Sequence, residues 1–233
     1  MNVARKAVGL ANRLGHQPSL ALAHWHLARL HQCRREAPLA LEHLRRTLDL
    51  CADSGLHRLA ARCIIAEGWN RVASGEVDAG LARMHDGMTA WQAAGLHRDR
   101  PRDNALLAMA YVAAGELDKA KETVERAVAM VEKSGERTWE ADVLRMHGEV
   151  VLAHDAGQSQ AAEAMFQSAL EVSRAQQAKS LELRAATSLA RLWQRKGARR
   201  KARNLLAPLH DWFIEGFETA DLTDAKALLD DLH

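Results

Sequence analysis

Histidines are the residues most suggestive of chemistry, because twelve of them occur in 233 residues and several lie close together. His24, His26 and His31 fall within eight residues, and His147 and His154 are seven apart. Metal ligands on one helical face recur at i, i+3 or i, i+4, whereas residues at i, i+2 point in roughly opposite directions. The spacing therefore favours structural or surface histidines, and we expect neither a metal site nor a cofactor.

The side chains that could act as nucleophiles do not form a recognisable catalytic group. No Ser, Cys or Lys stands beside a His and Asp pair in a pattern that one helical face would bring together. The carboxylates are interspersed with Arg and Lys, which is typical of solvated helix surfaces. We therefore expect a protein that is not an enzyme; a site assembled from distant segments is the alternative.

A basic segment near the carboxyl end offers a different kind of chemistry. Seven positive charges occur there without an acid: Arg191, Arg195, Lys196, Arg199, Arg200, Lys201 and Arg203. Such a run could contact phosphates, and it gives the alternative function of a nucleic-acid-associated transcriptional regulator using the basic turn 191–203. Aromatic residues for base stacking are sparse, so we favour a solvated turn balanced by the acids of the tail, Asp221, Asp224, Asp230 and Asp231.

The overall composition indicates a helical protein of the cytoplasm. Aromatic residues make up only 4% of the chain, and the net charge of +2 is too small to attract nucleic acid in bulk. Cys33, Cys51 and Cys63 lack CxxC spacing, which favours reduced, buried thiols. No apolar run reaches the roughly 18 residues that span a bilayer, so we expect a cytoplasmic protein without a membrane partner.

The positions of the helices follow from a repeat of about 40 residues. Gly55-Leu56-His57-Arg58 recurs as Gly95-Leu96-His97-Arg98, and a second series of breaks lies between: Arg35-Glu36, Gly75-Glu76, Gly115-Glu116, Gly157-Gln158 and Gly197-Ala198. Between breaks, apolar residues fall at three- and four-residue steps, which predicts two amphipathic helices per repeat. The repeated histidines, His57 and His97, are predicted to lie just past a helix end, near its negative dipole.

Small residues mark where neighbouring helices must approach closely. The breaks of the second series are the inner breaks, and five residues after each of them stands a small residue: Ala40, Gly80, Ala120, Ala162 and Ala202. Four positions later stands a large apolar residue: Leu44, Met84, Val124, Phe166 and Leu206. We call each such set of equivalent repeat positions a column. The first helices hold a further small column, Ala28, Gly68, Ala108 and Ala190, with Val150 as the departure. These columns resemble tetratricopeptide repeats. The usual repeat is shorter, at about 34 residues, and ends near a proline, so the longer repeats here predict an extended second helix.

The resemblance implies an all-α fold, a right-handed α-solenoid of about five helix pairs with a partial N-terminal helix and a C-terminal capping helix. The expected divisions of one domain, 1–233, are a partial repeat 1–16, full repeats 17–56, 57–96, 97–136, 137–178 and 179–217, and a cap 218–233. Thr219 or Asp221 is the predicted N-cap of the capping helix. No cap is visible at the amino end, which predicts a fragment or a face that a partner or a second copy covers as a homodimer.

The part of the chain from Ala178 to the carboxyl end carries a more specific resemblance, through positions 178–186, 205–208, 212–217 and 225–229. It is similar to the C-terminal repeats of bacterial signalling proteins that place a class III adenylate/guanylate cyclase domain, or a winged-helix regulator domain, before an AAA-type ATPase module. The resemblance implies an upstream cyclase or ATPase domain as one partner. No Walker A loop and no cyclase metal-carboxylate pattern occurs, so those activities do not transfer to this chain.

In tetratricopeptide folds the first helix of each pair lines the concave surface, and this predicts the partner-binding residues of a non-catalytic interaction or scaffold module. Counting back from each inner turn gives Trp25, His26, Arg29, Arg62, Trp69, Arg102, Met109, His147, His154, Arg184, Arg191 and Arg195. Trp and Arg are enriched in binding hot spots, and almost no acid belongs to this face, so we expect an acidic or amphipathic protein segment as the ligand. For Trp25 and Trp69, a place in the core is an equal alternative.

Overall fold

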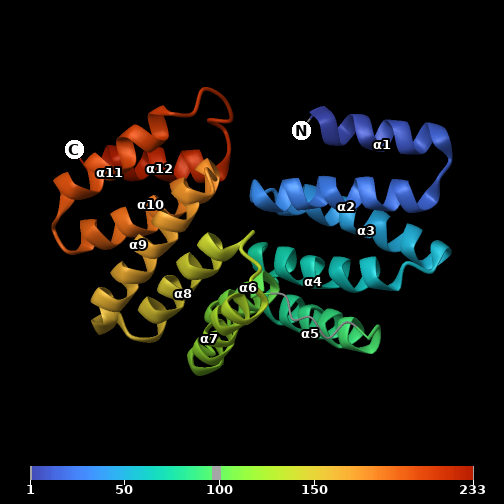
Figure 1. Cartoon of the computed structure of the whole chain (residues 1–233), viewed down its shortest axis with the longest axis horizontal. Helices are drawn as coiled ribbons and strands as arrows, with labels where there is room; N and C mark the ends of the chain where they lie inside the picture. Colours follow the sequence, from blue (N-terminus) through green and yellow to red (C-terminus); the bar gives the residue numbers. More distant parts are fainter. Residues whose placement is uncertain (1, 96–100, 233) are drawn as a thin grey trace. The chain divides into compact units, whose positions relative to one another are not determined.

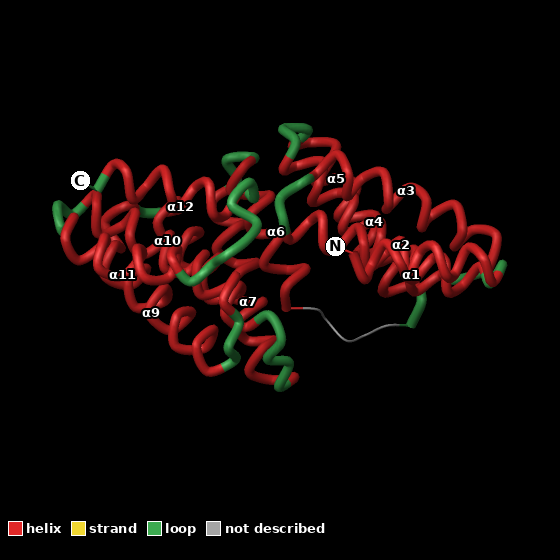
Figure 2. Tube along the Cα trace, turned by 90° about the horizontal axis from the view of Figure 1, so that it is seen from above, coloured by secondary structure: helices red, strands yellow, loops and turns green. Residues whose placement is uncertain are grey.

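The structure is a computed structural model that describes residues 2–95 and 101–232. Within these ranges it contains twelve α-helices, one short 3-10 helix and no β-strand (Figures 1 and 2). The all-α repeat fold predicted from the sequence is therefore confirmed. The chain divides into two compact units, residues 1–99 and 100–233, and each unit is described by itself. The expected repeat boundary between residues 96 and 97, and with it His97, lies outside the described residues.

Unit 1 consists of five consecutive helices that run back and forth (Figure 1). They are α1 (Asn2–Leu14), α2 (Gln17–Cys33), α3 (Ala37–Ser54), α4 (His57–Ala73) and α5 (Val77–Ala93). Helices α2 and α3 form one packed pair and α4 and α5 the next, while the two first helices, α2 and α4, also contact each other. The core around α2, α3 and α4 includes the thiols of Cys51 and Cys63, which are buried as predicted, whereas Cys33 is half-buried.

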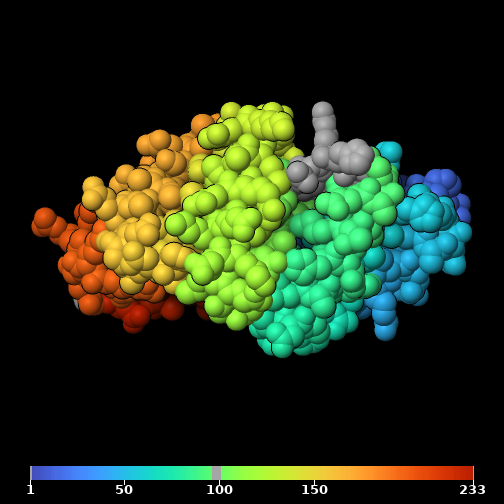
Figure 3. Space-filling model, turned by 90° about the horizontal axis from the view of Figure 1, so that it is seen from below, coloured from blue at the N-terminus to red at the C-terminus, as the bar shows by residue number. Residues whose placement is uncertain are grey.

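Unit 2 continues the helix-pair pattern and ends in a single helix. Its elements are α6 (Pro101–Ala113), α7 (Leu117–Ser134), α8 (Glu140–His154), η1 (Ala156–Gln158), α9 (Ser159–Ala175), α10 (Lys179–Arg195), α11 (Arg199–Asp211) and α12 (Ala220–Asp231). The first helices α6, α8 and α10 and then α12 contact one another in succession. The second helices α7, α9 and α11 succeed one another across the face shown in Figure 3. Thr219 is the N-cap residue of α12, as the sequence predicts.

The turns that follow the helices place one residue in the left-handed region. Glycine holds this position in most turns, with φ between 64° and 91°: Gly15, Gly55, Gly75, Gly95, Gly115, Gly135 and Gly197. Arg35 and Gln177 occupy the equivalent position with φ of 61° and 54°, although a side chain disfavours that conformation. At Gly157 the chain instead forms η1, where the Asp155 carboxylate accepts a hydrogen bond from the Gly157 N–H at 2.8 Å.

The small columns lie where helices meet, which confirms the packing predicted from them. Ala40, Ala120, Ala162 and Ala202 are completely buried, and the large apolar column beside them is at most 1% exposed. Helices α4 and α5 approach each other closely. A Cβ atom added to Gly80 would lie 2.7 Å from the Gly68 carbonyl oxygen, so the backbone leaves no room for a side chain.

Candidate functional site

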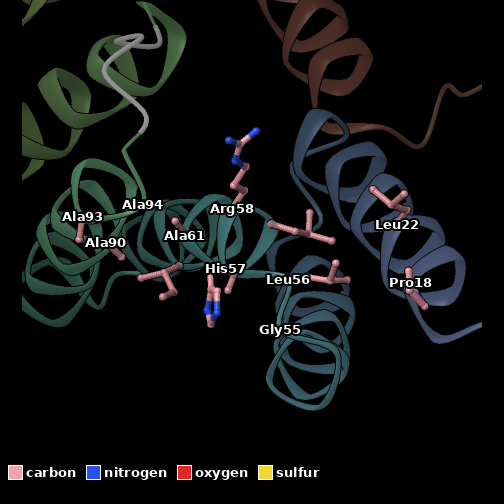
Figure 4. A pocket seen from close by; sticks show the side chains of 13 residues that line it. Pro18, Leu22, Gly55, Leu56, His57, Arg58, Ala61, Ala90, Ala93 and Ala94 are labelled. Atoms are coloured by element: carbon pink, nitrogen blue, oxygen red, sulfur yellow. The ribbon is translucent and has the colours of Figure 1, made fainter.

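Unit 1 carries an apolar groove of about 790 Å³ whose lining comes from three helices (Figure 4). The start of α4, residues 55–61 with Ile64, provides the middle of the wall. Pro18 and Leu22 of α2 lie on one side of it, and the end of α5 lies on the other. The volume falls within the range of about 300–1,000 Å³ that is typical of ligand sites. The groove is large enough to take several apolar side chains of a bound segment.

Small side chains keep this groove open. Helix α5 contributes Ala90, Ala93 and Ala94, whose i, i+3, i+4 spacing places them on one helical face. Ala60 and Ala61 of α4 also line the groove, and Leu22 on its α2 side is 47% exposed. An exposed leucine above alanine walls is an apolar surface that gains free energy when a partner covers it.

Positive charge at the mouth of the groove comes from the exposed side chain of Arg58 and from the start of α4. The N-cap is Leu56, whose side chain has no hydrogen-bond acceptor, so the partial positive charge of the helix N-terminus is not offset by a capping oxygen. His57 and Arg58 follow and project in opposite directions (Figure 4). Arg58 is exposed, and within the described chain no carboxylate pairs with it. The mouth therefore suits a carboxylate.

The position of His57 corrects one expectation from the sequence. The sequence predicts a place just past a helix end, near negative dipole charge, but His57 is the first residue of α4. Helix α3 has ended before it, at the left-handed Gly55. A turn this short brings the next helix N-terminus directly after the break, so Gly55-Leu56-His57-Arg58 forms part of the groove wall.

For Trp25 the sequence leaves the groove and the core as equal alternatives, and the structure places its side chain, 2% exposed, in the core of unit 1. It shares its repeat position with Ile65 and Ala105, which are also buried. The guanidinium groups of Arg29 and Arg62 lie 5.4 Å and 4.8 Å from the Trp25 ring centroid. These two arginines thus stabilise the packing of Trp25 through cation–π contacts.

The other two predicted residues of unit 1 differ in exposure. His26 is exposed and Trp69 is half-buried, and neither lines the apolar groove. Their contact with a ligand stays a prediction.

In unit 2 two of the predicted arginines, Arg102 and Arg184, converge together with Arg145 on a buried carboxylate, Asp142 of α8, which is 3% exposed. Arg145 Nη2 lies 3.0 Å from its Oδ1, while Arg102 Nε and Arg184 Nη1 lie 3.8 Å and 4.0 Å from its Oδ2. Arg184 Nε also lies 2.7 Å from an Asp221 carboxylate oxygen on α12. We call Arg102, Asp142, Arg184 and Asp221 the Asp142 ladder, because they link α6, α8, α10 and α12 in order.

Asp142 stays ionised at neutral pH although it is buried. Burial alone would raise the pKa of Asp142, but the guanidinium groups of Arg145, Arg184 and Arg102 together lower it to about 2. The expectation that this face has almost no acid is therefore wrong, because Asp142 and Asp221 neutralise its arginines. A ligand carboxylate would have to displace one of these internal partners.

The remaining predicted residues of unit 2 do not form one cluster. Arg191 lies 3.5 Å from Asp224, and His154 Nε2 lies 3.0 Å from an Asp118 carboxylate oxygen. Burial lowers the pKa of the half-buried His147. Met109 is half-buried and Arg195 is exposed. Ligand contacts at these positions stay predictions.

The basic segment 191–203 is partly neutralised by acids from neighbouring helices. Lys196 and Lys201 lie 2.9 Å and 3.5 Å from the Glu163 carboxylate of α9. The Arg199 guanidinium donates to the backbone carbonyl of Asp231. Arg191 pairs with Asp224, as the acidic-tail interpretation predicts.

Histidines of α2 meet a histidine of α3 rather than each other. The Nδ1 atoms of His24 and His43 are 3.1 Å apart, and the His31 ring stacks on His43 with a centroid distance of 5.5 Å. Burial, and then the neighbouring imidazole, lowers the pKa of both His24 and His43, so the neutral rings are favoured. The described residues contain no group of three or more side chains arranged to hold a metal ion.

Comparisons with known proteins agree with this repeat architecture. Residues 102–175 match a family model described as Tetratricopeptide repeat. No curated protein sequence matches the chain. None of the helices in the described ranges has both the length and the apolar character needed to cross a membrane.

Solved structures of low sequence identity share the fold. The nearly identical TPR-like repeats of a kinesin light chain-type protein from Podosopora anserina align with a TM-score of 0.55 and 22% identity, covering 84% of this chain and 95% of that chain. BtubC (BKLC) from P. vanneervenii aligns with a TM-score of 0.57 and 16% identity, covering 99% and 87%. The apo form of RapI aligns with a TM-score of 0.57 and 12% identity, covering 95% and 92%. The chain thus has an all-α, TPR-like repeat fold, and its residues 102–175 match the tetratricopeptide repeat family in sequence.

Proposed function

We propose that this chain is a non-catalytic protein–protein interaction module whose unit 1 groove binds an apolar, acid-bearing segment of a partner protein. Tetratricopeptide repeats generally mediate protein–protein interactions and typically serve as scaffolds. The observation that carries the proposal is the combination of an open apolar groove with an electropositive mouth at the start of α4. Leu22 and the alanine walls would bind the apolar side chains, and Arg58 would pair with the carboxylate.

The alternative of a nucleic-acid-associated regulator has less support. Its basic segment depends on free cations, but Lys196, Lys201 and Arg191 have acidic partners within the chain. Binding to phosphates would have to break these pairs. The finer proposal of a bacterial signalling protein with a cyclase or ATPase domain is supported only by the resemblance of the segment that begins at Ala178, and the coding region upstream of Met1 tests it.

Selection from a displayed peptide library tests the groove directly. The wild-type chain is the bait, and the variant Ala93→Phe with Arg58→Glu, which fills the groove and reverses the charge at its mouth, is the counter-selection target. We expect selected peptides to carry two or three large apolar residues at helical spacing together with Asp or Glu. Their affinity for the variant should fall by at least about tenfold, which corresponds to about 1.4 kcal/mol.

The matched control is Arg45→Glu, which reverses an exposed charge on α3 outside the groove lining. It should leave peptide affinity unchanged. Peptides that bind wild type and the groove variant equally well would show that the groove is not the binding site.

A further inference from the structure

Helix α1 carries an apolar stripe that the other described helices of unit 1 leave exposed. Val3, Leu10 and Leu14 are 80%, 51% and 69% exposed, and Ala7 between them is also exposed. The spacing of 4, 3 and 4 residues places all four on one helical face, as in helices that pair with another apolar surface. Ala11 is the buried residue through which α1 packs toward the rest of unit 1. The stripe is thus additional to the face that already packs on α2.

The charge of α1 limits what can cover this stripe. Arg5, Lys6 and Arg13 are its only charged side chains, and all are positive. Pairing two copies of α1 would bring six cations together, which opposes a symmetric α1–α1 contact. An apolar surface with carboxylates around it is the complementary occupant.

Unit 2 has such a surface in the segment between α11 and α12, residues 212–217, which we call the aromatic loop. Trp212, Ile214 and Phe217 are 56%, 91% and 52% exposed. The exposed acids Asp211, Glu215 and Glu218 are interspersed with them. The nearby cations Arg174 and Lys179 both pair with Glu182, at 2.8 Å and 2.7 Å, and Lys179 Nζ also lies 5.8 Å from the Trp212 ring centroid.

Ring contacts hold the aromatic loop in place. Trp212 packs edge-on against Phe213 with a centroid distance of 5.1 Å, and Phe217 lies 6.1 Å from the His210 ring. A recess of about 550 Å³, lined by Trp212, Arg174, Gln177 and Lys179, lies beside it. Exposed aromatic side chains that are already ordered lose little conformational entropy when a partner covers them.

We propose that copies of this chain associate head to tail, with the α1 stripe of one copy packed on the aromatic loop of the next. The two surfaces match in apolar character and are opposite in charge. Because the contact joins different surfaces, it is heterologous, and one copy can use its stripe and its loop at the same time. Both surfaces lie outside the unit 1 groove, so this proposal stands or falls separately from peptide binding.

Sedimentation velocity over a range from micromolar to several hundred micromolar tests the association. In low salt the weight-average mass should rise with concentration above the monomer mass of 25.7 kDa and should fall again in high salt. The stripe variant Leu10→Asp with Leu14→Asp, and the loop variant Trp212→Asp with Ile214→Asp, should each stay monomeric. The control Leu39→Asp, at an exposed leucine of α3, should associate like wild type.

Mixing the two blocked variants distinguishes a heterologous contact from any other. The loop variant retains the stripe and the stripe variant retains the loop, so an equimolar mixture should form a dimer and nothing larger. A wild type that is monomeric at every concentration, a loop variant that still associates, or a mixture that stays monomeric would each overturn the proposal. If circular dichroism shows that the Asp substitutions lower the helicity of α1, the variant Lys6→Glu with Arg13→Glu replaces the stripe variant. A chain with Glu215→Lys in its aromatic loop should then bind the reversed charges of this replacement variant.

Discussion

The two units build their first helices from the same repeat positions but use them in opposite ways. In unit 1 the starts of α2 and α4 border an apolar groove. Within the described residues, Arg58 at the mouth of this groove has no acidic partner. In unit 2 the first helices α6, α8 and α10 are joined to one another, and to α12, by the Asp142 ladder. The difference comes from one acid. Asp142 stands at the repeat position that Arg62, Arg102 and Arg184 occupy in other repeats, and it gives its arginine neighbours a partner within the chain.

The largest effect is expected from removing that acid. Asp142→Asn leaves Arg102, Arg145 and Arg184 facing an uncharged amide in a buried site, and this should lower the free energy of unfolding of unit 2 by about 3–5 kcal/mol. Urea denaturation with hydrogen exchange resolved by peptide measures the change in each unit. Asp53→Asn, at an exposed acid of α3, is the control and should be near neutral. A loss below about 1 kcal/mol would show that the ladder does not hold unit 2 together.

A smaller effect in unit 1 tests the close approach of α4 and α5 at Gly68 and Gly80. Gly80→Leu places side-chain atoms against the Gly68 carbonyl and the Val72 backbone nitrogen, and it should cost about 1–3 kcal/mol. Ala82→Leu, at an exposed position of the same helix, should be nearly neutral. Equal tolerance of both substitutions in thermal unfolding would contradict the packing of α4 on α5.

Acid should affect the units differently. The pKa values of His24 and His43 in the folded chain lie below their ordinary value of about 6.5, so the unfolded chain binds more protons as the pH falls through that value. The contribution of the neutral His24–His43 pair to the free energy of unfolding is therefore fully present above pH 6.5 and is lost on acidification. Asp142 of unit 2 keeps its charge over the same range, because its pKa is about 2.

Urea midpoints at pH 7.5 and 5.5 measure this loss in wild type and in His43→Gln. We expect the urea midpoint of unit 1 to fall less between pH 7.5 and 5.5 in His43→Gln than in wild type. His26→Gln, at an exposed histidine, should behave like wild type. A drop of the same size in all three would mean that the His24–His43 contact is not its cause.

The smallest effect concerns a turn of unit 2. Gln177 holds a left-handed position that glycine occupies in the equivalent turns, so Gln177→Gly should raise the stability of unit 2 by about 0.5–1 kcal/mol. Thermal unfolding measures it, with Gln176→Gly as the control, which should destabilise because Gln176 has right-handed backbone angles. A destabilised Gln177→Gly would show that this turn is not strained.

The helix pairs could be predicted from the sequence because their columns of small and large residues depend only on local spacing. Ala40 and Phe166 could be assigned to the core for that reason. The site was harder to predict, because exposure depends on which helices meet. Trp25 and Arg102 share the periodicity of groove residues, yet the first packs in the core and the second faces Asp142 from another helix.

One sequence motif of the groove can be recognised, but by itself it indicates only a turn between helices. The motif Gly55-Leu56-His57-Arg58 is recognisable as a repeated turn, but a turn motif does not show that the next helix starts inside it. The alanines of α5 give no chemical signal of their own. Only their position beside α4 makes them a groove wall.

Hydrogen exchange of the chain with and without a library-selected peptide tests the central claim most directly. Binding in the groove should slow exchange in segments that include residues 18–22, 55–64 and 90–94, while the helices of the Asp142 ladder keep their exchange rates. Protection centred on α8 and α10 instead, with residues 55–64 unchanged, would contradict the account.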